Sequence, residues 1–148
     1  MKIVCISDTH GLHKRVHVPP GDVLVHAGDF TDRGEPSEVD RFLDWLAALP
    51  HEHKVFVAGN HDFYVEEQNA YFQDQVRTLP RVSYLQDSGA VVAGLQFWGS
   101  PITPWFFDWA YNRHRGAEIR EHWDLIPKDT QVLVTHGPPR GILDRNFR

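Results

Sequence analysis

Sulfur is scarce in this sequence, which has one cysteine and one methionine among 148 residues. The single cysteine, Cys5, has no partner for an internal disulfide, and this favours a reducing compartment. Long apolar runs are also missing, since none approaches the roughly 18 residues that cross a bilayer. We therefore expect a cytoplasmic protein with no membrane partner.

Basic residues are in the minority, with 15 Lys and Arg against 20 Asp and Glu and a formal net charge of −5. Proteins that coat nucleic acid usually present a basic face to the phosphates, so nucleic acid is not an expected partner. The Gly-x-x-x-x-Gly-Lys phosphate loop is absent as well, which argues against a nucleoside triphosphatase. With 41% hydrophobic residues and the length of one ordinary domain, the chain is predicted to form a single domain over residues 1–148.

Short runs rich in Val and Ile recur along the chain and predict buried strands. The four clearest runs cover residues 2–7, 22–27, 54–58 and 131–135. Cys5 would lie inside the first of these strands, where a thiol is usually inert. Residues 83–97 are expected to form further strands around a turn at Gly89.

Three other segments have the character of helices. Residues 37–49 carry apolar side chains at spacings of three and four, with Ser37 as a candidate N-cap. Residues 64–79 and 115–125 are expected to form two further helices. Strands that alternate with helices predict an α/β fold in which the helices cover a mostly parallel sheet.

Metal-binding side chains follow each of the four predicted strands. They are Asp8 and His10, then Asp29 and Asp32, then Asn60, His61 and Asp62, and finally His136. Each group alone is an ordinary way to end a strand, because Asp, Asn and Gly form turns. Their recurrence is harder to attribute to chance, which would have to produce such a group at each of four strand ends. The carboxyl ends of the strands are also where α/β folds bind their ligands. Oxygen and imidazole donors without thiolate suit Mn, Fe, Zn or Mg.

The spacing within these groups suggests which residues could bind the same ion. Asp8 and His10 are two residues apart, so in an extended segment they point to one side and can chelate one ion. Asp29 has two carboxylate oxygens with which to bridge two ions. Asn60 and His61 are adjacent and face differently, so one can bind metal while the other reaches toward a substrate.

These motifs together resemble the calcineurin-like metallophosphoesterases. The stretches that carry the likeness to one branch, the brain metallophosphoesterases with MPPE domains and their bacterial relatives, are His26-Ala27-Gly28-Asp29, Gly99-Ser100-Pro101 and Thr135-His136-Gly137-Pro138-Pro139. The resemblance covers the whole chain. It implies a β-sandwich flanked by helices (αββα), with a two-metal centre between the sheets.

The resemblance also implies a role for each matching residue. The metal ligands would be Asp8 and His10 for the first ion, Asp29 for both ions, and Asn60 and His136 for the second ion. His61 would protonate the leaving oxygen or donate to the phosphoryl group. Asp62 would orient His61, and Asp32 would be a carboxylate behind the ligands.

The family's final Gly-His-x-His motif, which contributes one ligand to each metal, does not occur in this sequence. We therefore expect an αββα domain without its C-terminal strands, and three explanations stay open: a truncated or proteolysed product, a natural short form, or an inactive gene fragment. An exposed sheet edge would favour a homodimer or strand exchange. Four further histidines are expected at the surface or in caps, rather than as substitute ligands: His13, His17, His114 and His122.

The resemblance favours hydrolysis of a small phosphodiester, with a cyclic nucleotide as one candidate. We expect hydroxide activated at two divalent ions, among which Mn is favoured. The alternatives are a phosphomonoesterase and a metal-binding or interaction module without turnover. A metal-free hydrolase is disfavoured because no nucleophile stands at a strand-to-helix elbow. The aromatic segment 105–111 is expected to pack as core or loop cover, with stacking on a nucleobase as the alternative.

Overall fold

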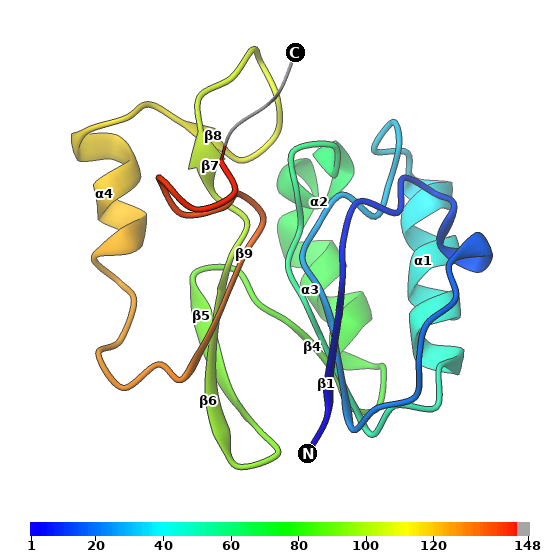
Figure 1. Cartoon of the computed structure of the whole chain (residues 1–148). Helices are drawn as coiled ribbons and strands as arrows, with labels where there is room; N and C mark the ends of the chain where they lie inside the picture. The colour runs from blue at the N-terminus through cyan, green and yellow to red at the C-terminus, as the bar shows by residue number, and fades with distance from the viewer. Residues whose placement is uncertain (145–148) are drawn as a thin grey trace.

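Two β-sheets pack face to face and carry helices on their outer sides, in a computed structural model that describes residues 1–144 (Figure 1). Helices α1 to α3 cover one sheet, and α4 lies on the far side of the other. The αββα architecture implied by the resemblance is thereby confirmed. The predicted domain runs to residue 148, and its last four residues lie outside the described part.

The first sheet is entirely parallel, in the order β1-β2-β3-β4. Its strands are β1 (Ile3–Ile6), β2 (Val23–His26), β3 (His53–Phe56) and β4 (Val82–Tyr84). The first three confirm the predicted strands, with ends that shift by one or two residues. All of β2 is buried, because it lies inside the sheet and is covered on both faces.

The second sheet is mixed, and the expectation of one mostly parallel sheet is wrong in this respect. Its strands β5 (Ser88–Val92), β6 (Leu95–Ser100) and β9 (Val132–Thr135) lie in the order β5-β6-β9. The β5–β6 pair is antiparallel, whereas β9 runs parallel to β6. A separate parallel pair joins β7 (Thr103–Pro104) to β8 (Asn112–Arg113).

The expected turn at Gly89 is also wrong. Gly89 lies inside β5 and pairs with Trp98, and the hairpin turns instead at Ala93 and Gly94. Both turn residues have positive φ, 49° and 81°. Two-residue hairpin loops with this backbone match the twist of the flanking strands, which is why the turn forms there.

Helix α1 (Pro36–Ala48) confirms the predicted helix over 37–49. Its start differs from the expectation, because Pro36 occupies the first helical position and places Ser37 inside the helix. The N-cap is Glu35, whose backbone N–H donates to the Glu38 carboxylate at 3.0 Å. The apolar stripe of α1 faces the sheet, where Phe42 and Leu46 are fully buried.

The predicted helix over 64–79 is divided in two, α2 (Phe63–Glu67) and α3 (Asn69–Arg77). The break falls at Gln68, whose φ and ψ of −112° and 34° are not helical. Helix α4 (Ala117–Trp123) confirms the helix expected over 115–125, and a short 3₁₀ turn, η1, spans His13–Arg15. Within residues 1–144, no helix has the length and apolar character of a membrane span.

Stacked aromatic rings form the core between the helices and the first sheet. The rings of Phe30 and Phe42 stack with centroids 4.1 Å apart, and Phe56 packs edge-on against both. Phe30 directly follows Asp29 along the chain and is fully buried. The core therefore fixes the backbone next to the central carboxylate of the site.

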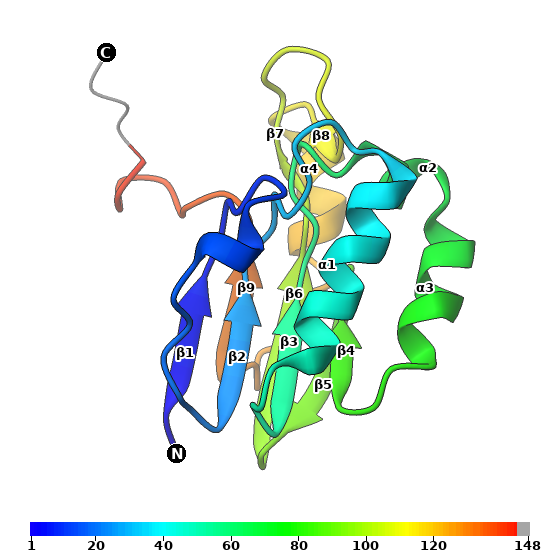
Figure 2. The same cartoon turned by 90° about the vertical axis from the view of Figure 1, so that its right-hand side faces the viewer.

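Cys5 is exposed, so the expectation that it is buried is wrong. It lies on β1, the outer strand of the first sheet, on the same side as Ile3, which packs against the core between the sheets. In Figure 2 the described strands of the second sheet lie behind β2 to β4 and leave β1 at an open margin. Leu133 on β9, at the corresponding margin of the second sheet, is 49% exposed.

Self-association through this margin stays a prediction. Because exposed strand edges and apolar side chains pair with other chains, we expect a dimer at high concentration. Sedimentation velocity measures it directly. A monomer that persists over the whole concentration range would contradict the expectation, and Leu133→Lys should weaken the dimer while leaving the fold intact.

Candidate metal centre

The loops that follow β1, β2, β3 and β9 meet at the carboxyl end of the sandwich, at the top of Figure 1. Two of the loops continue to pair after their strands end. The backbone N–H of Asp8 donates to Gly28 O at 2.9 Å, and that of His10 donates to Asp29 O at 3.0 Å. The predicted ligands on these loops are therefore held side by side by main-chain hydrogen bonds.

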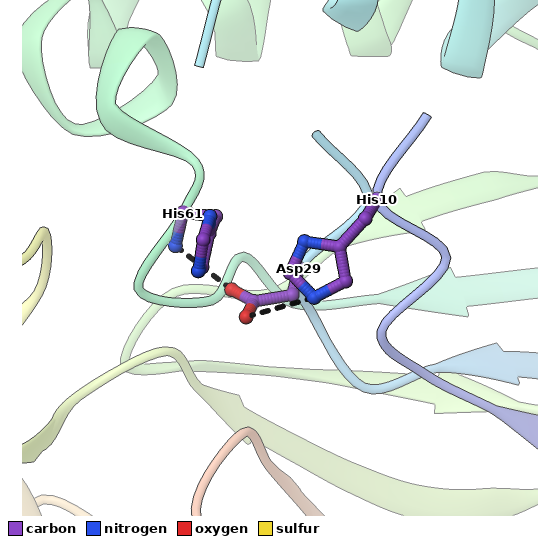
Figure 3. Close-up of side chains that lie close together, drawn as sticks. All are labelled: His10, Asp29 and His61. Carbon is purple, nitrogen blue, oxygen red and sulfur yellow. Dashed lines mark hydrogen bonds and ion pairs between the residues drawn. The ribbon is translucent and has the colours of Figure 1, made fainter. Parts of the chain in front are cut away.

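Asp29 is the centre of the cluster and is only 3% exposed. One of its oxygens lies 3.7 Å from His10 Nε2, and the other lies 3.4 Å from His136 Nε2. The second oxygen also accepts the backbone N–H of His61 at 2.8 Å (Figure 3). Burial raises the pKa of Asp29, but His136 and the His61 amide outweigh it and hold this pKa below its usual value.

The ligand atoms gather into two groups that share Asp29. One group contains His10, Asp29 and His61, and the other contains Asp8, Asp29 and His136, each with its ligand atoms within 4.8 Å of one another. Asp8 also lies 4.0 Å from His10, so the expected Asp8–His10 pair is brought together too. A carboxylate shared by two donor groups is the arrangement that bridges two cations.

His136 is oriented for a ligand role. Its Nδ1 lies 2.8 Å from Ala27 O, so Nδ1–H donates to that carbonyl and Nε2 faces the site. There Nε2 lies 3.0 Å from Asn60 Oδ1, so the two residues that the resemblance implies as ligands of the second ion lie together. Burial lowers the pKa of His136, but hydrogen bonding and attraction to Asp29 outweigh it and raise the pKa to about 9.

His61 is held in a similar way. Its Nδ1 lies 2.8 Å from Asp32 O, so Nδ1–H donates to the carbonyl and Nε2 is left free. Its ring meets His10 edge-on, with centroids 4.5 Å apart. The resemblance implied that His61 protonates the leaving oxygen or donates to the phosphoryl group, and its place beside His10 and Asp29 is also compatible with metal ligation.

The site is built on unusual backbone. Asp8, His10 and Asp29 all have positive φ, between 41° and 54°, a region that non-glycine residues seldom occupy and that accumulates at functional sites. Two glycines allow the loops to approach. A Cβ at Gly28 would lie 2.7 Å from His136 Nδ1, and one at Gly59 would overlap the Asp29 carboxylate.

Asp62 does not contact the His61 ring, contrary to the orienting role implied by the resemblance. Its fully buried carboxylate instead accepts four hydrogen bonds from the loops after β2 and β3. The donors are the backbone N–H groups of Asp29, Thr31 and Gly59, at 3.1, 2.9 and 2.7 Å, and the Thr31 hydroxyl at 2.7 Å. Burial raises the pKa of Asp62 to about 6, although the hydrogen bonds oppose the shift.

Asp32 contributes its carbonyl, not its carboxylate. The side chain is 58% exposed and lies 3.9 Å from Arg33 Nε, whereas the carbonyl orients His61. The carboxylate role implied for Asp32 therefore passes to a backbone atom. Sequence patterns could not show this, because any residue offers the same carbonyl.

His26, the last residue of β2, is a buried residue that the sequence analysis did not single out as functional. Its Nδ1 accepts the Gly28 N–H at 3.3 Å, so Nε2–H donates to the Thr9 hydroxyl at 3.0 Å. Burial, followed by repulsion from neighbouring histidines, lowers the pKa of His26 to about 3 and keeps the ring neutral. The ring thus links the loop of Asp8 and His10 to the loop of Asp29.

The four remaining candidate histidines lie away from the two ligand groups. His17 is exposed, and His114 is exposed with its ring stacked on Trp105. His122 pairs with Asp87 at 2.7 Å. His13 is 1% exposed and packs against Trp45, so its expected surface position is wrong: the ring fills the space between η1 and α1.

The aromatic segment 105–111 is divided in its environment. Tyr111 is buried in the core as expected, whereas residues 105–107 are exposed, so packing as core is wrong for that part. Trp109 packs against the His61 ring with centroids 4.2 Å apart, on one side of the metal-binding groups. The sequence gave no sign of this contact, because 48 positions separate the two residues.

Asp62→Asn tests the brace between the loops. An amide NH₂ would replace one acceptor oxygen and leave buried N–H donors unpaired, so the free energy of unfolding should fall by about 1–3 kcal/mol. Urea denaturation measures the loss. The matched control is Asp74→Asn, whose carboxylate is 72% exposed and should cost less than about 0.5 kcal/mol. Equal stability of the two variants would contradict the bracing role.

The donor set fits divalent metal ions. Carboxylate, imidazole and amide groups converge without a thiolate, and the His136 and His61 rings each donate Nδ1–H to a carbonyl, as metal-bound histidines do. Residues Asp8, His10, Asp29, Asn60, His61 and His136 are thus the side chains that could hold two ions.

Comparison with known proteins agrees with this geometry. Residues 1–146 match the family described as calcineurin-like phosphoesterase. Human metallophosphoesterase domain-containing protein 1 is 42% identical over 97% of this chain, and a UPF0046 protein of Caenorhabditis elegans is 41% identical over 98% of it. The chain spans about half the length of these relatives, 50% and 53%. A probable rhamnogalacturonate lyase C of Emericella nidulans matches at 37% identity, over 14% of its own length. The chain belongs to the calcineurin-like phosphoesterase family.

Proposed function

We propose that this chain is a metal-dependent phosphoester hydrolase that acts on a small phosphodiester, with a cyclic nucleotide as one candidate. The observation that carries the proposal is the Asp29 carboxylate shared by two groups of metal-binding side chains. Membership of a phosphoesterase family supports the same chemistry. The net charge of −5 favours a small substrate over a long nucleic acid.

The chain's own residues divide the work between holding ions and handling a proton. As the resemblance implies, Asp8, His10 and Asp29 would hold one ion, and Asn60 and His136 would complete the site of a second ion together with Asp29. Asp8 also groups with Asp29 and His136, so it could serve either ion. Lewis acidity and a hydroxide nucleophile near neutral pH come from divalent ions when they are bound. Manganese is our first choice among Mn, Fe, Zn and Mg.

His61 would supply the proton for the departing oxygen. Its Nδ1–H is already used by the Asp32 carbonyl, so a second proton can sit only on Nε2, the atom free to face the site. The ring is further restrained by Trp109 on one side and His10 on another. Restraint of this kind keeps a general acid in position, which typically contributes about 10²–10⁴-fold in rate.

A second candidate is a metal-binding module without turnover. The two groups of metal-binding side chains support it as well, because holding ions requires no further residue. A phosphomonoesterase is the nearest enzymatic alternative. Activity assays separate the three, because the module binds metal without hydrolysing either ester, and the monoesterase prefers p-nitrophenyl phosphate to the diester.

Metal binding is tested by titrating metal-free protein with Mn²⁺ in a calorimeter. We expect about two bound equivalents for the unchanged chain and loss of tight binding to both sites in Asp29→Ala, because both groups share this carboxylate. Asp40→Ala, on the exposed side of α1, is the matched control and should bind as the unchanged chain does. One equivalent that survives in Asp29→Ala would contradict the shared role.

Catalysis is tested with bis-p-nitrophenyl phosphate and Mn²⁺. His61→Gln should lower kcat by roughly 10²–10⁴-fold because it removes the proton donor, while the number of bound Mn²⁺ ions stays the same. Loss of a bound ion in His61→Gln would instead identify His61 as a ligand. No hydrolysis by the unchanged chain, with two ions bound, would favour the module.

A further inference from the structure

The segment between β7 and β8 presents a row of aromatic rings to solvent. Trp105 is 47% exposed, Phe106 68% and Phe107 67%. Single exposed apolar residues are ordinary, but neighbouring ones that form a patch mark binding surfaces. The Phe106 and Phe107 rings also contact each other edge-on, with centroids 4.4 Å apart.

The backbone of this segment is held by hydrogen bonds to Asn112 and Arg113. Asn112, which is 7% exposed, donates from Nδ2 to Phe106 O at 2.9 Å and accepts the Thr103 hydroxyl at 3.0 Å. The N–H of Trp105 donates to Arg113 O at 2.8 Å. The aromatic rings are therefore presented by a loop with defined hydrogen bonds, and a preformed surface costs less ordering on binding.

The same segment is joined to the metal-binding groups. Ala110 N–H donates to Asn60 O at 3.2 Å, and Trp109 packs on His61 with ring centroids 4.2 Å apart. In Figure 1 the β7–β8 loop rises from the end of the sandwich where the strand ends converge. A substrate whose phosphorus lies between the ions would thus have the Trp109 ring beside it, on the loop that also carries the exposed rings.

The charge of residues 104–112 indicates which part of a substrate this segment can bind. Residues 104–112 contain no Lys or Arg, and their single charged side chain is Asp108. Of the basic residues that follow, Arg113 pairs with Glu66 and His114 stacks on Trp105, so the exposed Phe106 and Phe107 rings offer no cation to phosphate oxygens. Aromatic faces instead bind planar rings by offset stacking and edge-to-face contacts.

We propose that residues 105–109 form a binding surface for a planar aromatic group of the phosphoester, so that the enzyme selects aryl or heteroaryl esters over simple alkyl ones. A nucleobase is one example of such a group. The proposal rests on the proposed function, because it places the phosphoryl group at the two ions. Because His61, the proton donor, contacts Trp109, the aromatic group belongs to the leaving side of the ester.

The direct test compares phenylphosphonate with methylphosphonate, which carry the same anionic head and are not hydrolysed. Calorimetry with the Mn²⁺-loaded chain should show phenylphosphonate binding roughly 5- to 150-fold tighter, the range expected for stacking of one ring on aromatic side chains. The double variant Phe106→Ala/Phe107→Ala should lose most of this preference and keep the affinity for methylphosphonate. Tyr71→Ala, which removes an exposed aromatic ring on α3, is the matched control and should change neither.

A second test compares the hydrolysis of two esters. Benzyl methyl phosphate and dimethyl phosphate release alcohols of similar acidity, so a difference in kcat/KM reports binding of the ring. The unchanged chain should prefer the benzyl ester, and the double variant should lose that preference with its rate on dimethyl phosphate unaltered. If no ester is hydrolysed while phenylphosphonate still binds preferentially, the proposed function fails and the aromatic surface stands.

Two results would overturn the proposal. The first is equal affinity for the two phosphonates, or absence of binding by both, in the Mn²⁺-loaded chain. The second is a double variant that keeps the preference but sediments differently from the unchanged chain, because the exposed rings would then be a contact between copies of this chain.

Discussion

The buried Asp62 carboxylate is the interaction on which the site depends. It ties the loop after β2 to the loop after β3 through four donors, and one of them is the backbone N–H of Asp29 itself. Without that link, the two loops would be joined mainly by the hydrogen bonds that His61 makes with Asp29, Thr31 and Asp32. A buried carboxylate without a cationic partner is costly, and these hydrogen bonds offset the cost.

Asp29 and Phe30 connect the metal-binding groups to the aromatic core. Asp29 faces the metal-binding groups while Phe30, the next residue, is buried among the rings of Phe42 and Phe56. Positive φ at Asp29 makes this reversal of direction possible. Strain at a functional residue persists where the surroundings fix it, and here the aromatic core on one side and Asp62 on the other do so.

Sequence reasoning reached the ligands because their placement follows from a rule of parallel sheets. Asp8, Asp29 and Asn60 each follow a strand of the first sheet by a few residues, and the carboxyl ends of neighbouring parallel strands meet. His136 follows β9 of the second sheet, which ends on the same side of the sandwich. The sandwich itself came from the resemblance, because alternation of strands and helices does not distinguish one sheet from two. The predicted turn at Gly89 was wrong because the hairpin turns at Gly94, five residues further on, where the space around the backbone is open.

Contacts between distant segments were beyond the sequence. The Asp62 brace, the Asp32 carbonyl behind His61 and the Trp109 ring on His61 depend on how loops from different strands fold over one another. Cys5 was misjudged for a related reason, since burial of an outer strand depends on how far the opposite sheet extends. The local sequence pattern predicts which strand or loop carries a side chain, whereas its contacts depend on tertiary packing.

The central claim is that Asp29 lies between two cations. Anomalous diffraction from crystals soaked in Mn²⁺ tests it most directly. We predict two anomalous peaks about 3.5–4 Å apart, with the Asp29 carboxylate between them, one beside His10 and the other beside His136. A single peak, or peaks that leave Asp29 outside both coordination shells, would contradict the account.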